Sequence, residues 1–146
     1  MTDAYDAEQL ADLDRRIDGW LTELADEHDH IIAVDRSDDG GATWRKVLGN
    51  DQWTGATDIV IDPRDPDRLY AATWDRHRTV AAYMGGGPGT GLHRSVDGGR
   101  SWEKLTRGLP ESRMGKIGLA ISPQDPDVLY AAIELDRRSG AVYRSS

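Results

Sequence analysis

The sequence predicts an all-β fold of repeated antiparallel units that follows one N-terminal helix. Two segments predict it because each occurs twice. Residues 61–72, which contain Asp-Pro and end in Leu-Tyr-Ala-Ala, return at 121–132, and an octet of the pattern Ser-x-Asp-Gly-Gly-x-(Thr/Ser)-Trp occurs at 37–44 and again at 95–102. Together they define a four-stranded unit of about 60 residues, and units of this kind build the blades of β-propellers.

The first predicted element is an amphipathic helix over residues 6–28. Asp6 and Gln9 have the spacing of a capping box, and apolar side chains recur behind them with the period of a helix. These apolar residues are Leu10, Leu13, Ile17, Trp20, Leu21 and Leu24. We therefore expect residues 1–30 to form a helical segment that is separate from the repeats over 31–146.

The predicted strands follow one another in a regular order. Two precede the first full unit, at 31–36 and 44–48. Four belong to that unit, among them the alternating stretch Ile59–Ile61 and the run Leu69–Ala72. Three more follow it, which makes nine strands and about two and a half four-stranded antiparallel blades.

A closed ring of blades needs at least about 200 residues at this repeat length. We therefore expect an incomplete ring that is marginally stable or oligomeric, with missing blades or a second copy as partners at its open sheet edges. The helix over 6–28 either caps one of these edges, or the chain is a fusion or begins in a mis-started reading frame.

Each octet contains the residues that a hairpin turn needs. Asp39 and Asp97 can accept hydrogen bonds from backbone N–H groups inside the turn, and the glycines at 40–41 and 98–99 supply positive φ angles. Trp44 and Trp102 are expected to fold back as apolar anchors between strands. The residues of the octets can therefore be explained by the turn that they form, without any role in binding or catalysis.

The octets resemble the Asp-box, or BNR repeat, of sialidases, of xyloglucanase-type glycoside hydrolases and of the ten-bladed sortilin-type receptor domain. The intervening Pro-x-Asp-Pro-x-x-Leu-Tyr-Ala-Ala strands are most similar to bacterial glycosyl-hydrolase-like BNR proteins and sortilin-like propellers. The resemblance covers residues 31–146 and implies that the octet residues hold the blade periphery, away from any substrate. They are Ser37, Asp39, Gly41, Thr43, Trp44, Ser95, Asp97, Gly99, Ser101 and Trp102.

Composition and charge disfavour several classes of function. A net charge of −8 without a basic stripe argues against nucleic-acid binding. The absence of cysteine excludes disulfides, thiolate metal sites and cysteine nucleophiles. No apolar run approaches the roughly 18 residues of a membrane span, and no basic, apolar leader opens the chain, so we expect a cytoplasmic protein with no membrane partner.

Metal binding has little support in the sequence. The octets partly imitate a calcium-binding EF-hand loop, but Lys46 or Lys104 stands where that loop requires a bidentate Glu. The four histidines, at 28, 30, 77 and 93, have no metal-ligand spacing. We therefore expect neither a metal ion nor a cofactor.

The most site-like cluster precedes the Gly-rich segment 85–91, which we expect to be a flexible loop between the second and third strands of the full unit. It consists of Trp74, Asp75, Arg76, His77, Arg78 and Tyr83. Arginine and aromatic side chains beside a loop can bind an anionic or carbohydrate ligand through bidentate and stacking contacts. The alternative is a solvated loop whose Trp74 covers the blade. The Gly-rich segment is not followed by the Lys-Ser/Thr of a phosphate loop.

A glycosidase needs two carboxylates at a defined separation. The available carboxylates are Asp58, Asp62, Asp65, Asp67 and Asp75. Those at 62, 65 and 67 belong to an Asp-Pro turn, where they serve the backbone, and the Arg-Ile-Pro start of sialidases is absent, so we assign no catalytic residue. Two hypotheses remain: a non-catalytic propeller fragment that offers a binding or scaffold surface to carbohydrate or protein, or part of a sialidase- or xyloglucanase-like glycoside hydrolase whose active site needs further blades.

Overall fold

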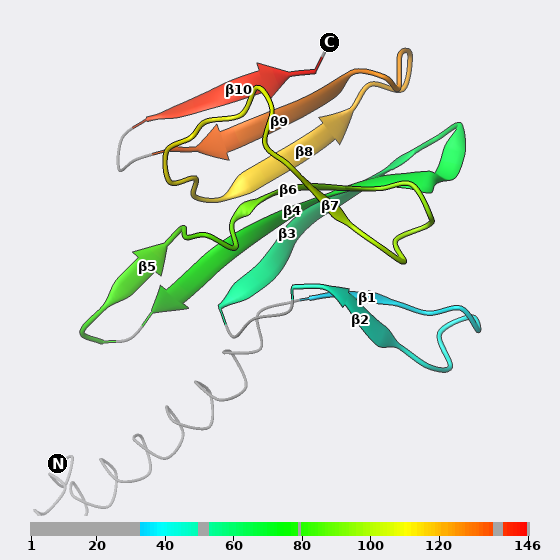
Figure 1. Cartoon of the computed structure of the whole chain (residues 1–146), viewed down its shortest axis with the longest axis horizontal. Coiled ribbons are helices and arrows are strands. Elements are labelled where there is room, and N and C mark those ends of the chain that lie inside the picture. The colour runs from blue at the N-terminus through cyan, green and yellow to red at the C-terminus, as the bar shows by residue number, and fades with distance from the viewer. Residues whose placement is uncertain (1–32, 50–52, 79, 136–138, 146) are drawn as a thin grey trace, which may run out of the picture. The chain divides into compact units, whose positions relative to one another are not determined.

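The described part of the chain is entirely β. The computed structural model describes residues 33–49, 53–78, 80–135 and 139–145, and its ten strands form three antiparallel sheets (Figure 1). These residues contain no helix with the length and apolarity that crossing a membrane requires. The all-β prediction is confirmed, whereas the helix expected over 6–28 and the boundary after residue 30 lie outside the described residues.

The largest sheet corresponds to the full predicted unit. Its strands pair in chain order, which is the order expected for a four-stranded antiparallel unit: β3 (Thr54–Asp62), β4 (Asp65–Arg78), β6 (Gly91–Ser95) and β7 (Glu103–Leu105). The predicted Gly-rich loop between the second and third strands is present over residues 86–90, whereas the alternative of a solvated loop at Trp74 is wrong. Strand β4 continues to Arg78, and an unpredicted short strand, β5 (Tyr83–Gly85), pairs with its last three residues.

Two smaller sheets correspond to the partial units on either side. Strands β8 (Ile117–Ile121), β9 (Leu129–Glu134) and β10 (Gly140–Arg144) pair in the order β10-β9-β8, like the first three strands of the full unit. Strands β1 (Val34–Arg36) and β2 (Arg45–Leu48) form a hairpin around the first octet, like the last two strands of the full unit. The repeat is therefore visible in the sheet order, while the arrangement of the sheets as blades of an incomplete propeller ring remains a prediction.

The apolar core lies where the largest sheet faces the three-stranded sheet. Ala72 and Ile117 are fully buried, and Ala131 and Ile133 are 3% and 2% exposed. Because the hydrophobic effect scales with apolar area removed from water, each buried isoleucine contributes about 1.5–3 kcal/mol. Small alanines on both sheets allow the two layers to approach closely.

Polar side chains join the first strands of these two sheets. The hydroxyl group of Thr57 on β3 donates to the carbonyl oxygen of Ile117 at 2.9 Å, and the backbone N–H of Leu119 on β8 donates to Asp58 Oδ2 at 2.7 Å. The same pairs show that β3 and β8 run side by side in the same direction. Equivalent residues of consecutive units therefore lie at matching heights.

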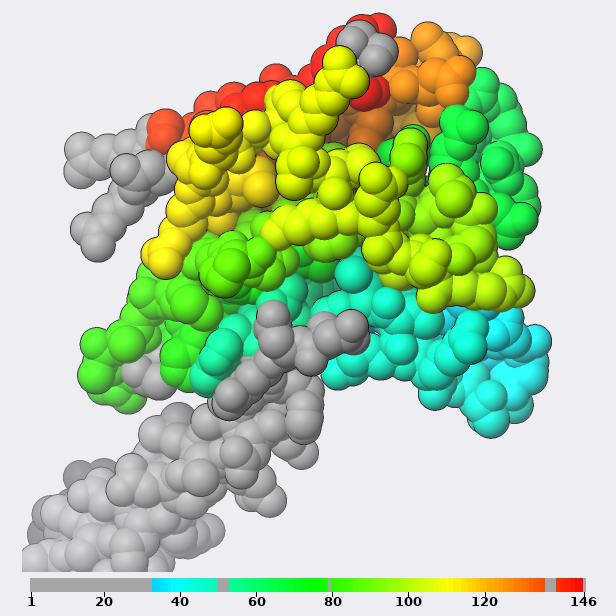
Figure 2. Space-filling model, viewed as in Figure 1, coloured from blue at the N-terminus to red at the C-terminus, as the bar shows by residue number. Residues whose placement is uncertain are grey.

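The connections between strands alternate between two ends of the sheets, as they must in an antiparallel path. One end, which we call the octet end, holds the octets and the Asp-Pro turns, and the N–H of Gly98 there donates to the carbonyl oxygen of Asp67 at 3.0 Å. The opposite end, which we call the loop end, holds strand β5 and the connections 86–90 and 106–116. Figure 2 shows the β7–β8 connection, in yellow, on the surface of the viewed face.

Candidate functional site

The side chains of the first octet form a closed hydrogen-bond network within the turn. Ser37 Oγ donates to Asp39 Oδ1 at 2.7 Å and accepts from the N–H of Gly41 at 2.7 Å. Asp39 in turn accepts from the hydroxyl of Thr43 at 2.6 Å and from its backbone N–H at 2.9 Å. These donors, led by the Thr43 hydroxyl, hold the pKa of the Asp39 carboxyl well below its ordinary value.

The second octet repeats this network on its own residues. Ser95 Oγ donates to Asp97 Oδ1 at 2.8 Å, and the hydroxyl of Ser101 donates to Asp97 Oδ2 at 2.6 Å. Ser101 thus takes the place of Thr43 and holds the pKa of Asp97 low in the same way. Gly99, like Gly41 in the first octet, has a positive φ, of 81°, which permits the turn. Every acceptor oxygen of these carboxylates faces a donor of its own turn, so no reactive carboxylate is presented.

The two octet tryptophans, both predicted to lie between strands, differ in their exposure. Trp44 is 65% exposed, and its Nε1 donates to the carbonyl oxygen of Gly41 at 3.0 Å, so it folds onto its own turn. Trp102 is partly buried, and a Cβ atom built on Gly99 would lie 3.4 Å from its ring. The expectation of an inter-strand anchor is therefore wrong for Trp44, because the short sheet formed by β1 and β2 leaves its ring at the surface.

Asp75 from the predicted binding cluster is buried and bonded inside the protein. It lies on β4 and is 4% exposed. Its Oδ1 accepts from the Thr54 hydroxyl at 2.5 Å, and its Oδ2 accepts from the N–H of Gly89 at 2.8 Å. A Cβ atom built on Gly87 or Gly89 would collide with this carboxylate. Asp75 therefore holds the Gly-rich segment against the end of the sheet.

The rest of the cluster forms two aromatic contacts at the loop end. The guanidinium carbon of Arg76 lies 5.4 Å from the centroid of the Trp74 ring, within cation–π range. The His77 ring meets Trp53 edge-on with centroids 3.8 Å apart. Tyr83 on β5 pairs in register with Arg78 and is 65% exposed. The structure thus collects the six predicted residues on β4 and β5, where a strand rather than a loop positions them.

Four of the five carboxylates considered for glycoside hydrolysis, those of Asp58, Asp62, Asp65 and Asp75, have partners within the protein. Asp58 accepts from Leu119 as described, and Asp65 accepts from the N–H of Asp67 at 3.1 Å. Asp62 is 1% exposed and accepts from the backbone N–H of Arg64 at 2.9 Å and from guanidinium groups. Among them, only Asp62 lies in an ion-pair cluster, which the sequence analysis did not foresee.

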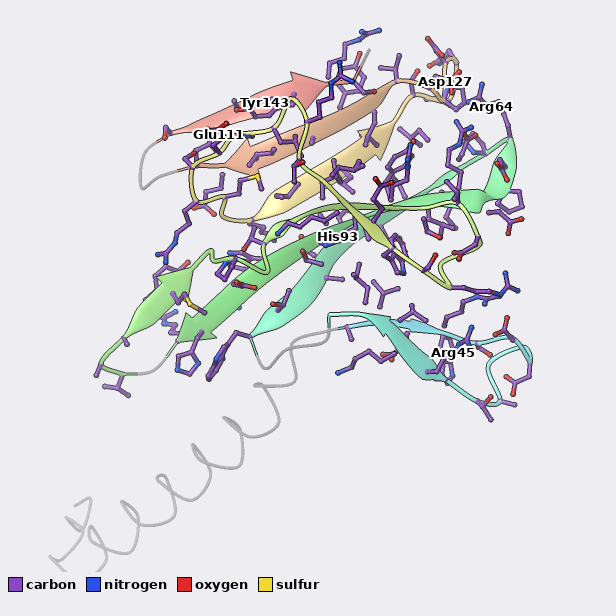
Figure 3. The ribbon with its side chains drawn as sticks, in the orientation of Figure 1. Arg45, Arg64, His93, Glu111, Asp127 and Tyr143 are labelled. Carbon is purple, nitrogen blue, oxygen red and sulfur yellow. The ribbon has the colours of Figure 1, made fainter. Side chains whose placement is uncertain are left out.

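That ion-pair cluster joins the two Asp-Pro turns at the octet end. Arg64 contacts Asp62 at 3.1 Å and Asp127 at 2.9 Å, and Arg68 contacts the same two carboxylates at 3.3 and 3.0 Å. Figure 3 shows Arg64 beside Asp127. The guanidinium groups, Arg64 first, lower the pKa of both carboxyls. The signal in the sequence is a difference between repeats, since Gln124 and Val128 stand where the first repeat has the two arginines.

His93 lies on β6 and is partly buried. Burial, followed by the positive charge of Lys104, lowers its pKa to about 4. Its ring is therefore neutral at physiological pH. Among the described residues, no group of three or more His, Cys, Asp and Glu side chains is close enough together to hold a metal ion.

Two cavities of ligand size lie in the described part of the chain. One, of about 520 Å³, lies at the loop end between Gly87–Thr90 and the connection after β7. The other, of about 540 Å³, lies between the largest sheet and the three-stranded sheet. Both volumes fall within the range of roughly 300–1,000 Å³ that is usual for small-molecule sites. Each lining contains a single carboxylate, Asp127 between the sheets and Glu111 at the loop end, so neither lining holds a carboxylate pair.

Comparison with known proteins points to carbohydrate-active relatives. No protein-family model matches the chain, and no solved structure gives a significant match. A xyloglucanase of Acetivibrio thermocellus is 33% identical over 123 residues, which cover 71% of this chain and 14% of that protein. A xyloglucanase of Paenibacillus sp is 30% identical over 146 residues, covering 82% of this chain and 12% of that protein.

A third relative is the dispase autolysis-inducing protein of Streptomyces mobaraensis, which is 37% identical over 71 residues, covering 48% of this chain and 18% of that protein. The chain thus spans less than a fifth of the length of each of these relatives. The expected resemblance is confirmed in its coarse form, as similarity to parts of xyloglucanases. Membership of the Asp-box family remains a prediction.

Proposed function

We propose that residues 33–145 are blades of an Asp-box β-propeller that acts as a non-catalytic binding surface, with its loop end toward a carbohydrate. The observation that supports this proposal most is that the candidate catalytic carboxylates are hydrogen-bonded within the protein. Asp58, Asp62 and Asp75 each accept hydrogen bonds from donors within the protein. A glycosidase needs one carboxyl free to donate a proton and another free to attack or to activate water, so this set is better suited to holding the fold.

The loop end offers the contacts that sugars use. Aromatic faces stack against the apolar faces of sugar rings, and arginine supplies several donors in a fixed geometry. Trp74 with Arg76 and the exposed Tyr83 provide both on β4 and β5. The similarity to xyloglucanases makes xyloglucan the first polysaccharide to test.

Affinity electrophoresis of the full chain in gels that contain xyloglucan tests the binding role. Tyr83→Ala, at the loop end, is expected to reduce the retardation of the chain several-fold. Trp44→Ala is the matched control because Trp44 is also 65% exposed but lies at the octet end, and it should leave the retardation unchanged. Equal effects of the two variants, or no retardation of the wild type, would refute the proposal.

The second candidate is a glycoside hydrolase whose active site is completed by further blades, and the xyloglucanase relatives favour it. Release of reducing ends from xyloglucan and from a chromogenic sialoside separates the two candidates. The binding role predicts no turnover by this chain alone. Reproducible turnover that is lost in a folded Asp58→Asn or Asp75→Asn variant would establish the second candidate instead.

A further inference from the structure

We propose that the cavity between the largest sheet and the three-stranded sheet binds a small anionic ligand with a ring-shaped body. This cavity, which we call the inter-sheet cavity, is distinct from the aromatic cluster at the loop end. Its volume is about 540 Å³, enough for a ligand of one or two rings. It is lined from both sheets and from the connection that follows β7.

The floor of the inter-sheet cavity is apolar and formed by facing surfaces. Leu92 pairs in register with Leu105, which places both on one face of the largest sheet. Opposite them, Leu129 and Ala131 are 7% and 3% exposed on the three-stranded sheet. Apolar walls on both sides favour a flat body over a hydrated ion.

Two tyrosines flank this floor from opposite sheets. Tyr70 pairs in register with Arg94, so both project from the same face of the largest sheet. Tyr143 pairs in register with Ala131, which places it on the facing surface of the three-stranded sheet, and Figure 3 marks it on β10. Two tyrosine rings on facing sheets can hold a planar or sugar ring between them, and their hydroxyl groups can donate to it.

The rim of the inter-sheet cavity is positively charged, although the chain as a whole carries a net charge of −8. Arg94 is balanced by Glu103 at 2.9 Å, and Asp127, the one acidic residue of the lining, is balanced by the arginines of the ion-pair cluster. Arg107 remains, and no carboxylate of the described residues pairs with it. Arg144 pairs in register with Tyr130, on the other face of the three-stranded sheet, and donates to the carbonyl oxygen of Ser145 at 3.2 Å. An uncompensated guanidinium group above an apolar floor selects a carboxylate, sulfate or phosphate group.

A matched pair of probes isolates the charge requirement. 4-Nitrophenyl β-D-glucuronide and 4-nitrophenyl β-D-glucopyranoside share the aromatic ring and the sugar ring and differ in one carboxylate. By isothermal titration calorimetry the glucuronide should bind at least about tenfold more tightly than the glucoside, because a charge-assisted hydrogen bond is among the strongest single contacts. Raising the salt concentration should weaken binding of the glucuronide several-fold, since the rim arginines are exposed and salt screens their charge.

Variants assign the binding to the inter-sheet cavity. Arg107→Ala should weaken binding of the glucuronide about tenfold, and Arg107→Lys should keep most of the affinity. Arg45→Ala, which replaces an exposed arginine on β2 outside the lining of the cavity, should leave the affinity within about twofold of the wild type. Circular dichroism of each variant checks that it is folded. Phenyl phosphate binding as tightly as the glucuronide would mean that the oxyanion alone is selected, and weaker binding would mean that a uronate is preferred; both results support the proposal. Equal affinity for the glucuronide and the glucoside, or unchanged affinity in Arg107→Ala, overturns it.

Discussion

Replacement of Asp75 tests whether this carboxylate supports the fold or performs chemistry. In Asp75→Ala, the Thr54 hydroxyl, on a residue that is 5% exposed, and the N–H of Gly89 both lose their acceptor. A hydrogen bond to a charged group contributes about 1.5–3 kcal/mol. We expect a loss of about 3 kcal/mol in the free energy of unfolding, the low end for two bonds, because the shorter side chain leaves room for water to reach the donors.

The assay is urea unfolding of the full chain followed by tryptophan fluorescence. Asp75→Asn keeps the shape and one acceptor oxygen, so it should cost about half as much as Asp75→Ala. Asp125→Ala is the control, since the exposed Asp125 carboxylate makes no hydrogen bond or ion pair with the described residues, and it should be nearly neutral. If Asp75→Ala unfolds within about 0.5 kcal/mol of the wild type, the carboxylate does not hold the Gly-rich segment and its burial needs another explanation.

Three further predictions follow from the packing and the charges. Gly89→Ala should destabilise the fold by more than about 1 kcal/mol because its Cβ would collide with Thr54 and Asp75, while Gly118→Ala, which meets open space, should be neutral when both are melted under the same conditions. Ile117→Ala should cost about 2–5 kcal/mol in urea unfolding and Ile61→Ala, at a residue 52% exposed, less than about 1; equal costs would contradict the assigned core. The pKa of His93 is about 4 in the folded protein and about 6.5 when unfolded, so the unfolded state binds the extra proton first and stability should fall as the pH drops from about 6.5 towards 4. His93→Gln should flatten that slope, and an unchanged slope would show that other groups cause it.

Most of the strand order could be predicted because the information is local and repeated. Each octet carries its own donors and acceptors within eight residues, so its turn closes whatever surrounds it. The extension of β4 to Arg78 could not be predicted in the same way. It depends on Asp75 meeting Thr54 and Gly89, which lie 21 and 14 residues away along the chain. Charged residues in a Gly-rich neighbourhood favour a loop by composition, and tertiary bonds overrode that preference.

The sequence predicted which residues belong to the candidate site, but it did not predict what each of them does there. The sequence singled out Trp74 and Tyr83 as aromatic residues at the loop end, and the structure places them on neighbouring strands there. No pattern in the sequence indicated that the Asp75 carboxylate is buried in hydrogen bonds within the protein, or that Arg107 lines a cavity together with two tyrosines. Both facts depend on which faces of two sheets meet, and that relation connects residues of different repeats.

Differences between the repeats explain how their packing is made specific. The apolar layer of Ala72 against Ala131 is non-directional, so it does not by itself fix how far one sheet slides along the other. Asp58 fixes this offset by accepting from the N–H of Leu119, and its counterpart in the second repeat is Gly118, which has no side chain for the task. The ion-pair cluster differs between the repeats in the same way as Asp58, since its arginines occur in the first repeat alone. Polar residues that occur in only one repeat therefore define one particular interface, whereas the residues shared by both repeats define the unit itself.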